Sequence, residues 1–224
     1  MHAQSLHSQM IRPRTLPRAF VCLALILSSC SSVYFGALEK VGVHKRDLMV
    51  KRVGKARDAQ EEAKEQFQTT LEQFSQLTGF NGGDLQSTYE RLQAAYDRSE
   101  AKAKAVQARN DDVESVSKAL FREWNAELKT FENAELRNNS ERQLRSAEQK
   151  YERLMVAMRR AEVQIDPVLR AFRDQVLYLK HNLNARAISS LQGELRRVEI
   201  DVSSLVREME RSIGEAEAFI RSME

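Results

Sequence analysis

Apolar and small side chains recur along most of this chain at alternating steps of three and four residues. That spacing places them on one face of an α-helix in a coiled coil. Four such seams can be followed: Met49, Val53, Ala56, Gln60, Ala63, Phe67, Thr70, Phe74, Leu77; then Leu85, Tyr89, Leu92, Tyr96, Ser99, Ala103, Val106, Asn110, Val113, Ser117, Leu120, Trp124; then Leu144, Ala147, Tyr151, Leu154, Met158, Ala161, Ile165, Val168, Phe172, Val176, Leu179, Leu183; and finally Ile188, Leu191, Leu195, Val198, Val202, Leu205, Met209, Ser212, Ala216, Phe219, Met223. The pattern predicts an all-α fold, either an elongated antiparallel coiled coil or a long four-helix bundle.

The seams are separated by segments that predict turns. Residues 79–83 (GFNGG) suit a helix end and a hairpin turn, and Asp84 is placed to cap the next helix. A second turn is expected at residues 133–139, followed by a capping box made by Ser140 and Gln143. Around residues 180–185 the spacing of the apolar residues changes to two steps of four, which favours a third, tight turn. A continuous helix through residues 181–187 is the open alternative.

Two polar or helix-breaking residues interrupt otherwise regular seams. Pro167 normally ends or kinks a helix, but the seam keeps its phase across it, so a kinked continuous helix is expected, with Asp166 as a local cap if the helix breaks. Asn110 lies on an apolar stripe. It either fixes the helix register as a buried polar insert or faces solvent at the bundle edge.

The amino-terminal segment has the three-part order of an export signal. Three arginines at positions 12, 14 and 18 precede an apolar run over residues 19–28, which is far shorter than the roughly 20 residues of a spanning helix. Residues 27–30 (LSSC) resemble the bacterial lipobox, in which the cysteine is acylated and becomes the new amino terminus. We therefore expect a signal peptide over residues 1–29, a lipidated tether over 30–36 and a helical domain over 37–224, with either Met1 or Met10 as the true start.

What the resemblance implies is membrane anchoring through palmitate or a similar acyl chain on Cys30. Ser31 follows the cysteine, where lipoproteins kept at the inner membrane often carry aspartate, so the resemblance favours the outer membrane, facing the periplasm. Two or more acyl chains anchor a protein stably where one does not. The other cysteine, Cys22, lies inside the signal, so the helical domain has no disulfide.

The charge of the chain changes when the signal is removed. The full sequence has 35 basic and 32 acidic residues. Loss of the three signal arginines leaves 32 of each, and the mature chain is formally neutral. The sequence pI near 8.9 is thus a poor argument for nucleic-acid binding, and no nucleic-acid partner is expected.

One basic stretch lies close to the predicted anchor. Near an anionic lipid surface each such charge contributes about 1 kcal/mol to binding. The alternative is an ordinary solvated helix face. The candidate membrane-surface residues are Lys45, Arg46, Lys51, Arg52 and Lys55.

No catalytic constellation stands out. His44 and His181 are the histidines of the mature chain, and without cysteines they make a poor start for a zinc site. The adjacent acids at 61–62 and 111–112 point to different sides of a helix and do not converge on a substrate. Residues 81–84 (NGGD) have no following Lys-Ser or Lys-Thr, as a phosphate loop would. We expect no enzyme activity, no cofactor and no metal.

The aromatic residues on the seams are expected in the core or at an interface rather than as platforms for nucleobases. These are Tyr89, Tyr96, Trp124 and Tyr151.

Three strings carry a family resemblance: residues 34–47 (YFGALEKVGVHKRD), 80–84 (FNGGD) and 172–185 (FRDQVLYLKHNLNA). With them the chain resembles bacterial domain-of-unknown-function family 2959 over nearly all of its mature length. The resemblance implies an envelope protein with a helical, coiled-coil body, and it brings no activity or catalytic residue.

The leading hypothesis is an acylated envelope lipoprotein whose coiled-coil body scaffolds or docks other proteins, or associates with itself. The alternative is a peripheral helical module that binds lipid through the basic stretch. A third is a periplasmic chaperone-like factor, which needs a concave pocket that a narrow bundle seldom offers.

The lipobox generates a direct prediction. Mass spectrometry of the exported protein should find an amino-terminal acylated Cys30, and Cys30→Ser should lose the acyl chains and leave the membrane fraction, while Cys22→Ser should leave the mature protein unchanged. An unmodified Cys30 in the exported protein contradicts this prediction.

Overall fold

The computed structural model describes residues 44–78, 84–182 and 184–223, which belong to one compact unit, Val43–Glu224. The predicted signal, Cys30 and its tether, and the glycine turn at 79–83 lie outside the described residues.

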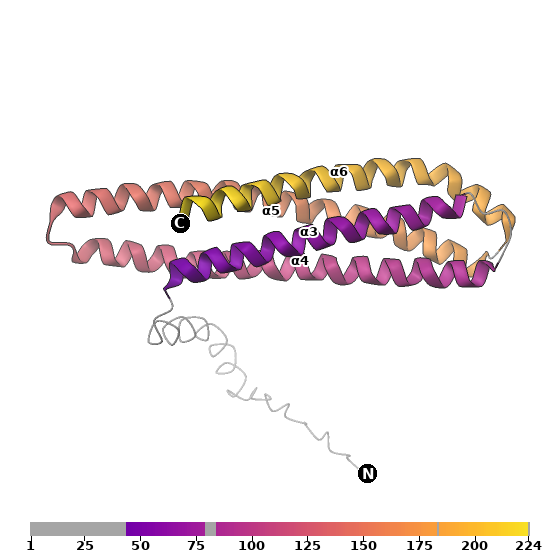
Figure 1. The fold of residues 1–224 in the computed structure, drawn as a ribbon, viewed down its shortest axis with the longest axis horizontal. Coiled ribbons are helices and arrows are strands. Elements are labelled where there is room, and N and C mark those ends of the chain that lie inside the picture. The colour runs from indigo at the N-terminus through magenta and orange to yellow at the C-terminus, as the bar shows by residue number, and fades with distance from the viewer. Residues whose placement is uncertain (1–43, 79–83, 183, 224) are drawn as a thin grey trace, which may run out of the picture. The chain divides into compact units, whose positions relative to one another are not determined.

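The described residues form four long α-helices and no strand: α3 (Lys45–Thr78), α4 (Leu85–Glu127), α5 (Ala134–His181) and α6 (Ala185–Met223), with the short 3₁₀ helix η1 (Leu128–Thr130) after α4. Each helix packs lengthwise against two others, in the cyclic order α3, α4, α5, α6 (Figure 1). Successive helices run in opposite directions. The predicted all-α antiparallel four-helix bundle is therefore confirmed.

The core consists of the seam residues, because one helical face of each segment is apolar and can leave water only by meeting the other three. Part of this core is an aromatic stack. The ring of Phe172 on α5 lies 5.2 Å from that of Phe74 and 6.1 Å from that of Phe67, both on α3. All three side chains are buried.

Asp84 caps α4 as expected, because its carboxylate accepts a hydrogen bond from the Gln86 backbone N–H at 3.0 Å. The predicted turn at residues 133–139 and the predicted capping box at Ser140 were wrong, because the break between α4 and α5 lies at residues 131–133. Helix α5 already begins at Ala134, because the Asn133 side chain accepts hydrogen bonds from the backbone N–H groups of Glu135 and Leu136. Ser140 lies inside the helix and accepts a hydrogen bond from the Trp124 indole at 2.8 Å. Because Asn133 already caps the helix, residues 135–139 are part of its exposed first turns.

The last two helices meet at a turn that is shorter than expected. Helix α5 ends at His181 with Asn182 as its C-cap, and α6 begins at Ala185. The question left open for residues 181–187 is thereby decided in favour of a turn. Pro167 lies inside α5, which continues through it as the unbroken seam predicted.

The hairpin of α4 and α5 extends beyond the other two helices (Figure 1). Helix α3 begins beside α4 at Glu123, to which Lys45 donates at 2.8 Å, and α6 ends beside the start of α3, where the Arg46 guanidinium donates to the Met223 carbonyl. Almost every residue between 125 and 143 is exposed, and the first buried residue of α5 is Leu144. We call residues 125–143 the projecting hairpin.

The aromatic stack generates a stability prediction. Phe172→Ala should lower the free energy of unfolding by about 3–5 kcal/mol, because it removes a buried ring and leaves a cavity between α3 and α5. Val163→Ala, at a side chain that is 69% exposed on the same helix, should change it by less than about 0.5 kcal/mol. Urea unfolding followed by circular dichroism measures both, and equal effects would contradict the packing described here.

Candidate functional site

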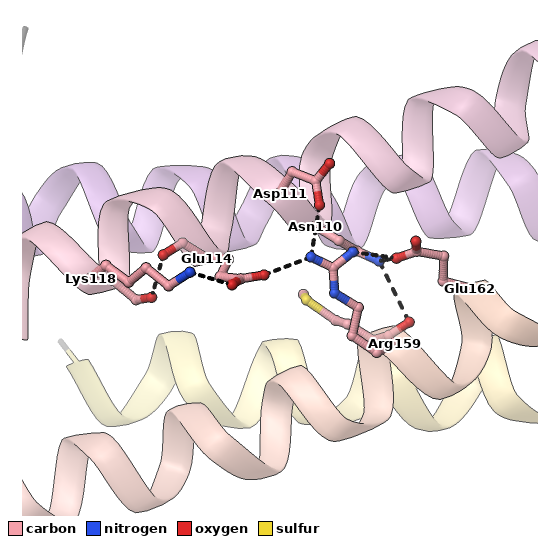
Figure 2. A network of polar contacts seen from close by, with 8 residues as sticks. Asn110, Asp111, Glu114, Lys118, Arg159 and Glu162 are labelled. Atoms are coloured by element: carbon pink, nitrogen blue, oxygen red, sulfur yellow. Dashed lines mark hydrogen bonds and ion pairs between the residues drawn. The ribbon is translucent and has the colours of Figure 1, made fainter. Parts of the chain in front are cut away.

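The densest cluster of interacting charged side chains lies where the middle of α4 faces α5 (Figure 2). Arg159 of α5 donates to Asp111 and Glu114 of α4, both at 2.7 Å, and to Glu162 on its own helix at 2.8 Å. Asn110 is fully buried and donates to the Glu162 carboxylate at 2.9 Å. We call Asn110, Asp111, Glu114, Lys118, Arg159 and Glu162 the α4–α5 clamp.

The clamp stabilises the charged form of its members. Burial disfavours the charge on Arg159, but the hydrogen bonds to Asp111, Glu114 and Glu162 outweigh burial and raise the pKa of Arg159. The hydrogen bond from Lys118, followed by that from Arg159, lowers the pKa of the Glu114 carboxyl. A guanidinium that stays protonated and carboxylates that stay ionised suit an electrostatic tie between helices rather than proton transfer.

The two adjacent acids at 111 and 112 point to different helices, as the sequence predicted. Asp111 pairs with α5 through Arg159, whereas Asp112 accepts from Arg52 of α3 at 2.7 Å. One turn of α4 is thus tied to both of its neighbours. The acids at 61 and 62 also separate, since Glu61 pairs with Lys64 and Glu62 with Lys102 of α4.

The five basic residues proposed for membrane contact fall into two groups. Three of them engage other helices: Lys45 pairs with Glu123, Arg52 with Asp112, and Arg46 reaches the carbonyl at the end of α6. Lys51 and Lys55 are exposed one turn apart on α3, and neither forms an ion pair with another described residue. Arg46 is exposed as well, and its bond to a neutral carbonyl does not compensate its charge, so of these five residues Lys45 and Arg52 alone are neutralised by described acids of α4.

The remaining candidates are dispersed. His44 precedes α3, which begins beside the end of α6, whereas His181 ends α5 next to the start of α6, and both are exposed. Within the ranges that the structure describes, no group of three or more histidine, cysteine or acidic side chains is placed to hold a metal ion. Nor does any helix among them combine the length and the apolar composition needed to cross a membrane.

The seam aromatics pack inside the bundle or along its edge. Tyr89 and Tyr96 pack against the apolar core. The ring of Tyr151 meets Phe121 edge to face at 5.4 Å, and Trp124 is the donor to Ser140 described above. Burial raises the pKa of the Tyr151 phenol. These positions fit the predicted core or interface role.

An open groove of about 480 Å³ runs between α5 and α6. Val156 and Ala157 contribute its apolar surface, and its charged rim carries both signs: Glu152, Arg153, Arg160, Arg211 and Glu215. With guanidinium and carboxylate groups mixed around it, the groove shows no preference for an anionic or a cationic ligand.

The spacing of the apolar residues predicted that Asn110 lies on the seam, but it did not predict the partners of Asn110 across the α4–α5 interface. The Arg159–Glu162 and Glu114–Lys118 spacings of three and four residues were visible as local pairs. Contacts of Arg159 with Asp111 and Glu114 depend on the register between two helices, which local spacing does not specify.

Fold and site together define a class of protein: an all-α, antiparallel four-helix bundle tied by ion pairs between helices. A search of curated proteins returned no match to the chain. The match to a protein family, described as "Protein of unknown function (DUF2959)", extends over residues 34–223. The chain belongs to this family, as the resemblance of its three strings indicated.

The clamp generates a second stability prediction. Arg159→Met should lower the free energy of unfolding by about 1–2 kcal/mol, because Asp111, Glu114 and Glu162 would then face one another without a cation between them. Arg160→Met is the matched control, since Arg160 is exposed and has no ion pair with a described residue, and it should have an effect below about 0.5 kcal/mol. Chemical unfolding at low and high salt tests both, and an Arg159→Met effect that does not shrink in high salt would contradict an ionic tie.

Proposed function

We propose that this protein is a membrane-anchored lipoprotein of the bacterial envelope, without catalytic activity, whose helical bundle acts as a scaffold that docks another protein through the projecting hairpin. The anchor is the acyl chain expected on Cys30, and the location is the periplasmic face of the outer membrane. Both rest on the lipobox and its upstream signal.

The observation that carries the docking role is the extension of α4 and α5 beyond α3 and α6. Over most of the bundle a helix buries its apolar face against two neighbours, but in residues 125–143 each has one. Phe131 and Leu136 are 36% and 56% exposed there. Phe131 lies in the turn between η1 and α5, and Leu136 in the first turn of α5. Together they offer a partner helix an apolar contact with charged residues around it.

The helical unit begins at the end from which this hairpin extends, because Lys45 lies beside Glu123. A lipid anchor upstream of α3 would therefore hold the bundle by that end. The partner that this arrangement favours is itself located at or near the membrane surface.

Lipid binding by the bundle is the second candidate, and Lys51 and Lys55 are the observation that favours it. Their two charges are exposed and close in sequence to the anchor. With Lys45 and Arg52 paired to acids of α4, Lys51, Lys55 and the exposed Arg46 contribute about 3 kcal/mol near an anionic surface, which supplements an acyl anchor without replacing it. A chaperone-like role would need a more enclosed pocket than the open α5–α6 groove.

Site-specific photocrosslinking in living cells tests the proposal. A photoreactive amino acid at position 136 should give a discrete protein adduct that the same residue at position 200 does not, since Ile200 is equally exposed, at 62%, but lies on α6. Phe131→Ser should reduce the adduct at 136 several-fold at an unchanged amount of protein, because it removes an apolar contact from the same hairpin.

The same experiment distinguishes the lipid-binding candidate. A photoreactive residue at position 51 should give mainly lipid adducts if α3 rests on the membrane. Lipid adducts at 51 together with no protein adduct at 136 would overturn the docking proposal in favour of the peripheral membrane module.

A further inference from the structure

Three polar side chains lie in the core with atoms that have no hydrogen-bond partner in the protein. Gln60 of α3, Asn110 of α4 and Ser212 of α6 are all 0% exposed. Both amide atoms of Gln60, the Asn110 Oδ1 and the Ser212 Oγ are unpartnered. We call these three residues the polar layer. Buried polar atoms are almost always paired, so these four atoms on fully buried side chains require an explanation; a fifth, the Oε1 of the partly buried Gln73, lies elsewhere on α3.

The register of α3 against α4 brings Gln60 and Asn110 to the same level. Thr70 of α3 and Ser99 of α4 share a hydrogen bond at 2.9 Å. Gln60 lies three seam positions before Thr70, and Asn110 three seam positions after Ser99. Because the two helices are antiparallel, these steps lead in the same direction along the bundle.

The apolar core supports this placement independently. A contiguous cluster of buried apolar side chains fills the bundle on the side of the aromatic stack and ends at Ala59, Val106, Ala161 and Met209 on the four helices. The next buried apolar residues beyond it are outside the cluster: Ala56, Val113, Met158 and Ala216. The polar layer therefore lies where this cluster ends: Asn110 is between Val106 and Val113, Ser212 is between Met209 and Ala216, and Gln60 is next to Ala59.

The unpartnered atoms define the chemistry of what they would bind. They offer amide N–H donors from Gln60, two carbonyl acceptors from Gln60 and Asn110, and a hydroxyl that does both. No charged group belongs to the set, because the Glu162 carboxylate at its edge is already bonded to Asn110 and Arg159. A neutral ligand that both donates and accepts matches this set, and a buried water commonly makes two to four such bonds.

We propose that the polar layer is an internal binding site for ordered water, which links Gln60, Asn110 and Ser212 and so connects α3, α4 and α6 at the middle of the bundle. The bound water completes the hydrogen bonds of atoms that no protein group reaches. It also distinguishes this level from the Thr70–Ser99 level, where two buried hydroxyls bond each other directly.

Oxygen-17 relaxation dispersion, which detects long-lived internal water, tests the proposal on the full chain. Gln60→Met keeps an unbranched side chain of similar size but removes the amide. It should lower the dispersion amplitude by the equivalent of at least one water molecule, and Ser212→Ala should lower it as well. Thr70→Val is the matched control, because it removes a buried hydroxyl whose partner is in the protein, and it should leave the amplitude unchanged.

Circular dichroism shows whether each variant folds, and if Gln60→Met does not, Ser212→Ala decides the test. An unchanged amplitude in a folded variant would overturn the proposal. So would a high-resolution crystal structure in which the Gln60 amide bonds Asn110 directly, or in which a larger molecule occupies the layer.

Discussion

The structure depends on one geometric constraint, the antiparallel register of four seams whose apolar residues repeat at steps of three and four. A helix of this composition gains little stability alone and is held by packing its apolar face. Once Thr70 meets Ser99, the level of every other contact between α3 and α4 follows, including the pairs of Arg52 with Asp112 and Lys102 with Glu62. Ion pairs at exposed positions contribute little individually. These ion pairs are therefore a consequence of the register between the helices rather than its main cause.

The seams, the four helices and the Asp84 cap could be predicted from the sequence because each depends on local spacing or on one side chain beside its own helix. The start of α5 could not, since Asn133 and Ser140 are both good N-cap residues and the sequence does not show which of them caps the helix. The α4–α5 clamp could not be predicted from the sequence either. Arg159 has one acidic residue at helical spacing on its own helix, Glu162, and its bonds to α4 require the register across an interface. Asn110 was left between two interpretations until its burial decided for the core.

Charge on α4 is arranged around that register. Over a single turn, Asn110 faces the core, Asp111 and Glu114 bond α5, and Asp112 bonds α3. The middle of α4 therefore contacts both neighbours at the level where the contiguous apolar cluster ends.

A polar layer in a core reduces stability, but it specifies one alignment among several that packing alone would permit. The residues next to this layer on α3 are small: Ala56, Ala59 and Ala63. Their packing alone would differ little between the observed register and one shifted by a heptad. Such a shift would place Gln60 opposite an apolar or a different polar side chain and move α3 along α4 by about 10 Å. The length of the projecting hairpin would change by the same amount, because this length is the distance that α4 extends past the first residue of α3. The alignment of Gln60 with Asn110 thus determines how far the proposed docking surface extends from the bundle.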